Sequence, residues 1–315
     1  MDILDRFVTG DIRALSRVIT MVENYSDGYQ ELLGQLYRRT GRSVRIGVTG
    51  PPGAGKSTIV NCLAHKFLDT GKKVGIVAVD PSSPFTGGAL LGDRVRMNEF
   101  SSGDGIFFRS MATRGATGGL SFATDNVTVV LDAFGFDVTL VETVGVGQVE
   151  LDIVDACDTV IVVLVPESGD SVQTMKAGLL EIANIMVVNK TDRPGSESIV
   201  SELEHTIHLK RQSVKDWPVT VIGTEAVNGK NIGKLFERIN EHVRFTKGSG
   251  HFDRHRHNQI RKRILNILRN RFQKEFLERL GDEVALDDVI DDIHNGTTDP
   301  FTVTDELYER FSRER

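Results

Sequence analysis

A glycine-rich stretch at residues 50–58 constrains the fold of this 315-residue chain more than any other feature. It matches the phosphate-binding pattern G-x-x-x-x-G-K-[ST]. A β-branched run at residues 44–49 precedes it and a helical pattern follows, which is the context that this pattern requires. The glycines let the backbone curl so that successive N–H groups point at one anion, and the helix N-terminus adds its dipole. The sequence therefore predicts a nucleotide-binding P-loop.

Two side chains of this loop have specific chemistry. Lys56 supplies a positive charge for the β and γ phosphates, and Ser57 supplies a hydroxyl ligand for Mg²⁺. The nucleotide contacts expected in the loop are Gly53, Ala54, Gly55, Lys56, Ser57 and Thr58.

Short β-branched runs alternate with helical patterns from residue 44 to about residue 245, which indicates a parallel sheet wrapped by helices. The expected strands are 44–49, 74–79, 136–141, 160–165, 185–188 and 219–222. We predict an α/β P-loop NTPase fold with a mainly parallel central sheet flanked by helices, and with helical extensions at both ends. The expected domains are an N-terminal helical extension (1–41), a P-loop domain (42–247) and a C-terminal helical arm (248–315).

Acidic residues follow two of the expected strands, where ligands of such sheets bind. Asp80 ends the second strand, and Asp93 comes after a Ser/Gly-rich loop. Because Mg²⁺ takes one or two carboxylates beside the phosphates, this pair suits it, although each acid also fits a capping role. Glu142 ends the third expected strand, and Gly145 is placed for its N–H to touch a γ phosphate. The predicted metal ligands are Ser57, Asp80, Asp93 and Glu142.

The residue after that glycine bears on the rate of hydrolysis. Ras-like proteins carry a water-positioning glutamine there, but this chain has Val146, and Gln148 comes two residues later. We expect slow unassisted hydrolysis, completed by a rearranged loop, a second subunit or a partner.

A second motif indicates the base. Asn189, Lys190 and Asp192 follow the strand at 185–188. The Asp192 carboxylate can accept two hydrogen bonds from guanine that adenine cannot donate, so the order of motifs favours GTP over ATP. The last loop expected to contact the base, with a weaker signal, is Thr224, Glu225 and Ala226.

Composition excludes several classes of protein. A net charge of −6 argues against nucleic-acid binding, and no apolar run is long enough to span a bilayer. The acidic N-terminus does not resemble a secretory signal. Cys62 and Cys157 lie in apolar runs, so we expect buried thiols in a reduced, cytoplasmic compartment.

The C-terminal part has a long helical pattern at residues 253–280. Basic residues in this helix precede an acidic block, which argues against a nucleic-acid or membrane surface. Three histidines, His251, His255 and His257, suggest either a metal site or a solvated hinge, and we favour the hinge.

These motifs together resemble the MeaB/ArgK-type G proteins, the family that includes the human methylmalonic aciduria type A protein. The resemblance covers about residues 10–245 and depends most on three longer stretches. They are 79–97, 109–120 and 142–148.

The resemblance implies a GTPase that forms homodimers and acts as a chaperone of adenosylcobalamin-dependent acyl-CoA mutases, chiefly methylmalonyl-CoA mutase. It implies that Lys56, Asp93 and Glu142 take part in catalysis. Residues 169–178 resemble the family's third switch, in which Gln173 and Lys176 would couple the nucleotide state to the mutase. GTP or GDP and Mg²⁺ would be bound directly, and adenosylcobalamin would be met only through the mutase.

Two alternatives belong to other classes. A nickel-insertion metallochaperone GTPase would share the P-loop, but it would usually add a His-rich tract or paired Cys and His ligands. A kinase linked to amino-acid transport would need a second substrate pocket with a base near the γ phosphate, and the sequence shows none.

Overall fold

The computed structural model describes residues 2–80, 105–112, 122–143, 149–168, 178–210, 217–283 and 286–313. The chain divides into two compact units, Met1–His255 and Arg256–Arg315. The predicted sites Asp93, Gly145, Gln173 and Lys176 lie outside the described residues, as do Val146 and Gln148.

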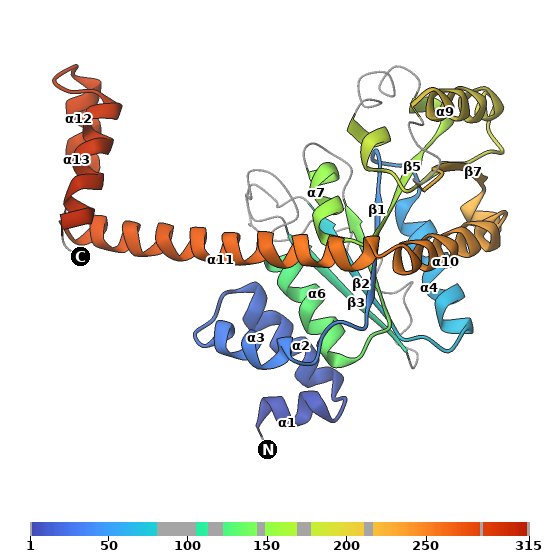
Figure 1. Ribbon diagram of the computed structural model, residues 1–315, viewed down its shortest axis with the longest axis horizontal. Coiled ribbons are helices and arrows are strands. Elements are labelled where there is room, and N and C mark those ends of the chain that lie inside the picture. Colours follow the sequence, from blue (N-terminus) through green and yellow to red (C-terminus); the bar gives the residue numbers. More distant parts are fainter. Residues whose placement is uncertain are drawn as a thin grey trace. The chain divides into compact units, whose positions relative to one another are not determined.

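The first unit is built on a seven-stranded sheet in the order β3-β2-β4-β1-β5-β6-β7, in which every neighbouring pair is parallel (Figure 1). The strands are β1 (Val44–Thr49), β2 (Val74–Asp80), β3 (Ile106–Ala112), β4 (Val138–Thr143), β5 (Thr159–Leu164), β6 (Ile185–Asn189) and β7 (Thr220–Thr224). Strand β1 lies at the centre, with Gly47 paired to Val141 of β4 and Val160 of β5. The predicted α/β class is confirmed.

Central strands β1, β4, β5 and β6 are buried along their whole length, as their apolar runs predict. Strand β4 begins at Val138, two residues later than expected, because the Phe136 N–H still closes the preceding helix by donating to the Leu131 carbonyl at 3.2 Å. The bounds of β5 and β7 differ from expectation by one or two residues.

Strand β3 was not expected from the sequence. It forms one edge of the described sheet, where it pairs with β2 from Val74↔Ile106 to Asp80↔Ala112. Several of its residues are only partly buried, and Arg109 and Ser110 interrupt its apolar run. An edge strand is covered less completely than a central one, so its hydrophobic pattern is weak.

Helices cover both faces of the sheet. Helices α4 (Lys56–Asp69) and α10 (Ile232–Gly248) pack on one face, where Leu63 and Leu235 share a core with Ile46 and Ile161. Helices α6 (Phe122–Phe134), α7 (Val149–Ala156) and α9 (Ser196–Lys210) contribute to the cores of the opposite face. Helix α7 lies so close to β1 that a Cβ atom on Gly47 would overlap Ile153.

Three N-terminal helices pack beside α6, as Figure 1 shows: α1 (Ile3–Val8), α2 (Ile12–Glu23) and α3 (Tyr29–Tyr37). Leu15, Val18 and Ile19 of α2 are fully buried in a core with Val127 and Leu131 of α6. The predicted helical character of this segment is confirmed. Ile12 and Tyr37, by contrast, are 51% and 40% exposed.

The second unit is helical. Helix α11 (His251–Glu283) supplies most of it, followed by α12 (Leu286–His294) and α13 (Pro300–Arg313). The Phe276 and Phe311 rings pack edge to face with centroids 5.1 Å apart. Helix α11 begins at His251 and continues through His255 and His257, so the three histidines lie in a helix and not in the solvated hinge that we favoured. Within the described residues, no helix has the length and apolarity needed to cross a membrane.

Candidate functional site: a P-loop joined to a base-reading loop

The P-loop connects the end of β1 to α4. Gly53 and Gly55 have φ values of +73° and +87°, which only glycine adopts at little cost. Gly55 is the N-cap of α4, so the unpaired N–H groups of a 14-residue helix face the loop. The curled backbone and the helix dipole together make an anion-binding concavity.

Lys56 is the first residue of α4 and is only 6% exposed. Its ammonium group donates hydrogen bonds to the carbonyl oxygens of Gly50 (2.7 Å) and Pro51 (2.9 Å). The loop therefore holds the positive charge over its own concave side, where a phosphate group is attracted both by the charge and by the N–H groups.

Ser57 and Glu142 meet where α4 begins and β4 ends. The Ser57 hydroxyl donates a 2.6 Å hydrogen bond to Oε1 of Glu142, whose residue is 5% exposed. Parallel pairing of Val48 with Glu142 brings the two strand ends together. One residue further along each strand, the Thr143 hydroxyl donates a hydrogen bond to the Thr49 hydroxyl at 2.8 Å. A hydroxyl and a carboxylate at this spacing are the hard oxygen donors that Mg²⁺ accepts beside phosphate oxygens, so the residues present fit that ion.

Asp80 is the last residue of β2, as predicted, and it is paired in register with Ala112. The described residues contain no cluster of three or more His, Cys, Asp or Glu side chains able to hold a metal by themselves. A site that binds the ion partly through phosphate oxygens has no need of such a cluster.

Asn189 ties the phosphate loop to the base-reading loops. Its Nδ2 donates to the carbonyl of Ala54 at 2.9 Å, across 135 residues of sequence. Its Oδ1 accepts from the Thr224 hydroxyl (3.0 Å) and from the backbone N–H of Ala226 (3.1 Å). The Asn189 side chain is 3% exposed, so these bonds form away from water. A Cβ atom on Gly55 would overlap Asn189, which explains the glycine there.

Lys190 has a positive φ of +60°, which is uncommon for a residue other than glycine. Its ammonium donates to the carbonyl of Gly53 at 2.7 Å, so its extended stem lies along the loop. Asp192 follows on an exposed turn that is fastened by the bond from Ser196 to the Thr191 carbonyl at 3.1 Å. The carboxylate is thus accessible to a base.

The third predicted loop lies beside this turn. The N–H of Thr191 donates to the Thr224 carbonyl at 3.1 Å, and its hydroxyl reaches Oε1 of Glu225 at 3.4 Å. An ion pair with Lys230 lowers the pKa of Glu225. Ala226 is buried and presents its backbone to Asn189. Glu225 therefore anchors the loop through Lys230, a partner that the sequence analysis did not identify.

Other supporting residues were also missed. Arg193 pairs with Glu167, which lies just after β5, and this pair links the Asp192 turn to the neighbouring strand end. Thr49 and Thr143 are fully buried hydroxyls that bond each other. In the sequence these residues are single polar positions within apolar or turn segments, so only the spatial pairing shows their roles.

The structure thus brings together Lys56, Ser57, Glu142, Asn189 and Thr224 at the carboxyl ends of β1, β4, β6 and β7. A P-loop, a strand-end acid and an Asn-Lys-x-Asp loop in this arrangement define a P-loop GTPase.

Comparison with known proteins shows to which family of P-loop GTPases the chain belongs. The family model described as "Methylmalonyl Co-A mutase-associated GTPase MeaB" matches residues 15–280, and the chain belongs to this family. It is 43% identical to a putative GTPase of Pyrococcus horikoshii over 98% of this chain and 97% of that protein. It is 31% identical to the mouse protein named "Methylmalonic aciduria type A homolog, mitochondrial", over 87% of this chain and 71% of that one.

A solved structure has the same fold over nearly its whole length. The crystal structure of a protein named "LAO/AO transport system kinase" superposes with a TM-score of 0.70 at 26% sequence identity. The match covers 98% of this chain and 96% of that one. The chain is therefore a GTPase with a GTP-binding site at the P-loop.

Proposed function

We propose that this GTPase uses Mg²⁺-dependent GTP hydrolysis to serve an adenosylcobalamin-dependent acyl-CoA mutase, gating cofactor loading and protecting the mutase. The observation that carries the proposal is the match of residues 15–280 to the mutase-associated GTPase family. The name of the mouse relative supports it. The client is taken to be methylmalonyl-CoA mutase, and adenosylcobalamin would be met only on that partner.

The described site supports the nucleotide part of the proposal. Lys56 would neutralise phosphate charge, Ser57 would bind Mg²⁺, and Glu142 would hold the water shell of the ion from the adjacent strand. Asp192 would recognise guanine through its exposed carboxylate, with Asn189 and Lys190 keeping its loop against the P-loop. We also assign Asp80 and Asp93 to the metal and Gln173 and Lys176 to coupling with the mutase, as proposals made from the sequence.

We propose a homodimer with the C-terminal arm as its contact. Helix α11 leaves five large apolar side chains between 40% and 55% exposed: Ile260, Ile264, Leu265, Leu268 and Phe272. An apolar stripe of this kind on a helix is typical of a surface that a protein partner covers.

Two other functions are weaker candidates. A nickel-insertion GTPase needs thiolate or imidazole ligands, but Cys157 packs in a hydrophobic core and burial raises the pKa of the Cys62 thiol, which keeps it protonated. A kinase is supported by the name of the superposed protein alone.

The test is steady-state phosphate release from GTP by the purified protein, alone and with apo-methylmalonyl-CoA mutase. ATP serves as the nucleotide control and Ser57→Ala as the hydrolysis-deficient control. We expect slow GTP-specific turnover that the mutase accelerates, and GTP-dependent gain of mutase activity when adenosylcobalamin is added. If the mutase neither binds nor changes the rate, the client assignment is wrong. Phosphate transfer from ATP to an amino-acid transport protein would favour the kinase.

A further inference from the structure

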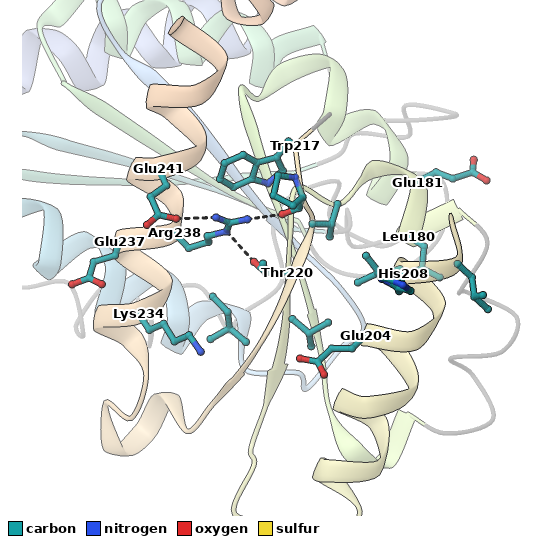
Figure 2. A pocket seen from close by; sticks show the side chains of 16 residues that line it. Leu180, Glu181, Glu204, His208, Trp217, Thr220, Lys234, Glu237, Arg238 and Glu241 are labelled. Atoms are coloured by element: carbon teal, nitrogen blue, oxygen red, sulfur yellow. Dashed lines mark hydrogen bonds and ion pairs between the residues drawn. The ribbon is translucent and has the colours of Figure 1, made fainter. Parts of the chain in front are cut away.

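A groove of about 1180 Å³ lies along the open edge of β7, and it contains none of the nucleotide-site residues described above. Strand β7 is the last strand of the described sheet, and α9 and α10 flank this edge (Figure 2). Edge strands offer unpaired N–H and C=O groups, and proteins usually cover most of them.

Side chains from α10 and its N-cap contact the backbone just before β7 and near its end. Arg238 stacks on the Trp217 ring at 3.8 Å and donates to the Pro218 carbonyl at 2.5 Å. At the other end, Asn231 donates to the Gly223 carbonyl at 2.7 Å. Between these two covered carbonyls lies Val221.

The backbone of Val221 is directed toward the groove. Carbonyl directions alternate along a strand. The Thr224 carbonyl accepts from Thr191 on the β6 side, whereas the Gly223 carbonyl accepts from Asn231 on the groove side. By alternation, the N–H and C=O of Val221 point the same way as those of Gly223. The middle of the edge can therefore pair with an added strand.

The two walls of the groove differ in chemistry. Apolar side chains gather on the α9 side, where Leu180, Ile207 and Leu209 line the groove together with Val219 and Val221. On the α10 side, the exposed residues Glu237 and Glu241 belong to the lining, and in Figure 2 the Glu241 carboxylate is turned toward Arg238. The lining holds four glutamates, Glu181, Glu204, Glu237 and Glu241, against Lys234 and Arg238. Arg238 and Glu241 form an ion pair at 2.8 Å, and beside this pair the lining holds Glu204 and Glu237 against Lys234, which makes the groove acidic.

We propose that this groove binds a short extended segment of a partner protein, one that alternates apolar and basic residues and pairs with β7 at Val221. Successive side chains of a strand point to opposite faces. Apolar residues of the segment would thus meet the α9 wall while Lys or Arg residues meet the carboxylates of α10. Main-chain pairing supplies affinity and the alternating pockets supply selectivity, as in other cases of strand addition.

A synthetic peptide tests this surface directly. The probe is fluorescein-labelled acetyl-(Lys-Val)₃-Lys-amide, and its binding to the full chain is followed by fluorescence polarisation with GDP present. A peptide of the same composition with its lysines and valines in separate blocks is the control for charge alone. Two further peptides carry N-methyl groups on alternate residues, one in each register. We expect the alternating peptide to bind, and one of the N-methylated peptides to lose at least tenfold in affinity.

Variants of the protein localise the binding. Glu237→Lys reverses the charge of an exposed residue of the groove lining. We expect it to lower the affinity for the alternating peptide about five- to tenfold. Glu202→Lys makes the same change at an exposed position of α9 outside the groove lining and should leave binding unchanged. Both variants should keep wild-type GTP hydrolysis, which shows that they are folded and separates this result from the proposed mutase function. Hydrogen exchange should show the Val221 amide slowed by the peptide.

Three results would overturn the proposal. They are no binding at millimolar peptide, equal weakening by Glu237→Lys and Glu202→Lys, or unchanged binding of both N-methylated peptides.

Discussion

The Ser57 hydroxyl lies 2.6 Å from Oε1 of Glu142, so the first turn of α4 and the end of β4 are joined by one short hydrogen bond. These residues are 85 positions apart in sequence. The contact places a neutral ligand and a carboxylate side by side at the mouth of the P-loop, where a divalent cation would be shared with phosphate oxygens.

Removing either partner should therefore impair metal-dependent steps first. For Glu142→Gln we expect the Mg²⁺ concentration that gives half-maximal GTP hydrolysis to rise about 10- to 100-fold, because the outer-shell carboxylate is lost. GDP affinity without Mg²⁺ should change little. The measurement is a Mg²⁺ titration of phosphate release, with Glu202→Gln, at an exposed position of α9, as a matched carboxylate control. An unchanged Mg²⁺ requirement would remove Glu142 from the metal site.

Asn189→Ala should both destabilise the protein and weaken GTP binding. The change leaves the Ala54 carbonyl, the Thr224 hydroxyl and the Ala226 N–H without their partner in a buried place. We expect a loss of about 2–4 kcal/mol in the free energy of unfolding. Urea unfolding gives this value, and calorimetry gives the GTP affinity. Asn189→Asp keeps the acceptor but turns a buried carboxylate oxygen toward the Ala54 carbonyl oxygen, so it should destabilise the protein at least as much as Asn189→Ala. If stability is unchanged, the bridge is not structurally important.

The glycines of the P-loop should differ in their tolerance of alanine. At Gly50, φ is +136° and a Cβ atom would overlap the Val163 carbonyl oxygen, a backbone atom that cannot move away. At Gly53, φ is +73° and an added Cβ atom would have no neighbouring atom within 4 Å. We expect Gly50→Ala to cost more than about 3 kcal/mol of unfolding free energy and Gly53→Ala about 1 kcal/mol. Chemical denaturation of both variants checks this order, and equal losses would contradict it.

His242 should make stability fall in mild acid. Burial lowers its pKa from 6.5 to about 4, with the neutral ring bonded to the Thr159 hydroxyl at 2.8 Å. Arg238 and His255 add to the shift by their charge. Because the unfolded chain binds this proton at higher pH than the folded chain, the contribution is complete above pH 6.5 and is lost as the pH falls toward 4. The loss is about 3 kcal/mol at most.

The variant His242→Gln isolates this effect. We expect the difference in unfolding free energy between wild type and variant to shrink as the pH falls through that window. Urea unfolding at several pH values measures it, and His205→Gln, at an exposed position of α9, is the control. A difference that does not vary with pH would show that His242 does not titrate as described.

Asp192→Asn should exchange the base preference. An amide at this position donates where guanine requires an acceptor, so we expect GTP affinity to fall at least 100-fold while xanthosine triphosphate binds better than GTP. Competition binding with GTP, XTP and ATP measures this. The carboxylate is exposed, so the variant should unfold like wild type. Retained GTP affinity would show that Asp192 does not read the base.

The sequence by itself determined the local elements of this protein, because each depends on residues that are close in the chain. The P-loop was identified from one short stretch whose glycines indeed adopt positive φ. Strands β1, β5 and β6 were predicted because they are buried on both faces and so have continuous apolar runs. The family could also be predicted, since its motifs are contiguous.

Only the tertiary structure decided which of these elements meet. The bonds from Asn189 to Ala54 and from Ser57 to Glu142 join distant segments, and parallel pairing of the strands sets their geometry. Strand β3 was missed because an edge strand lacks the continuous apolar pattern. The groove along β7 likewise exists only because two helices pack on opposite faces of the last strand of the described sheet. Local sequence patterns report burial and turn chemistry, whereas contacts between distant residues depend on strand order, which those patterns do not contain.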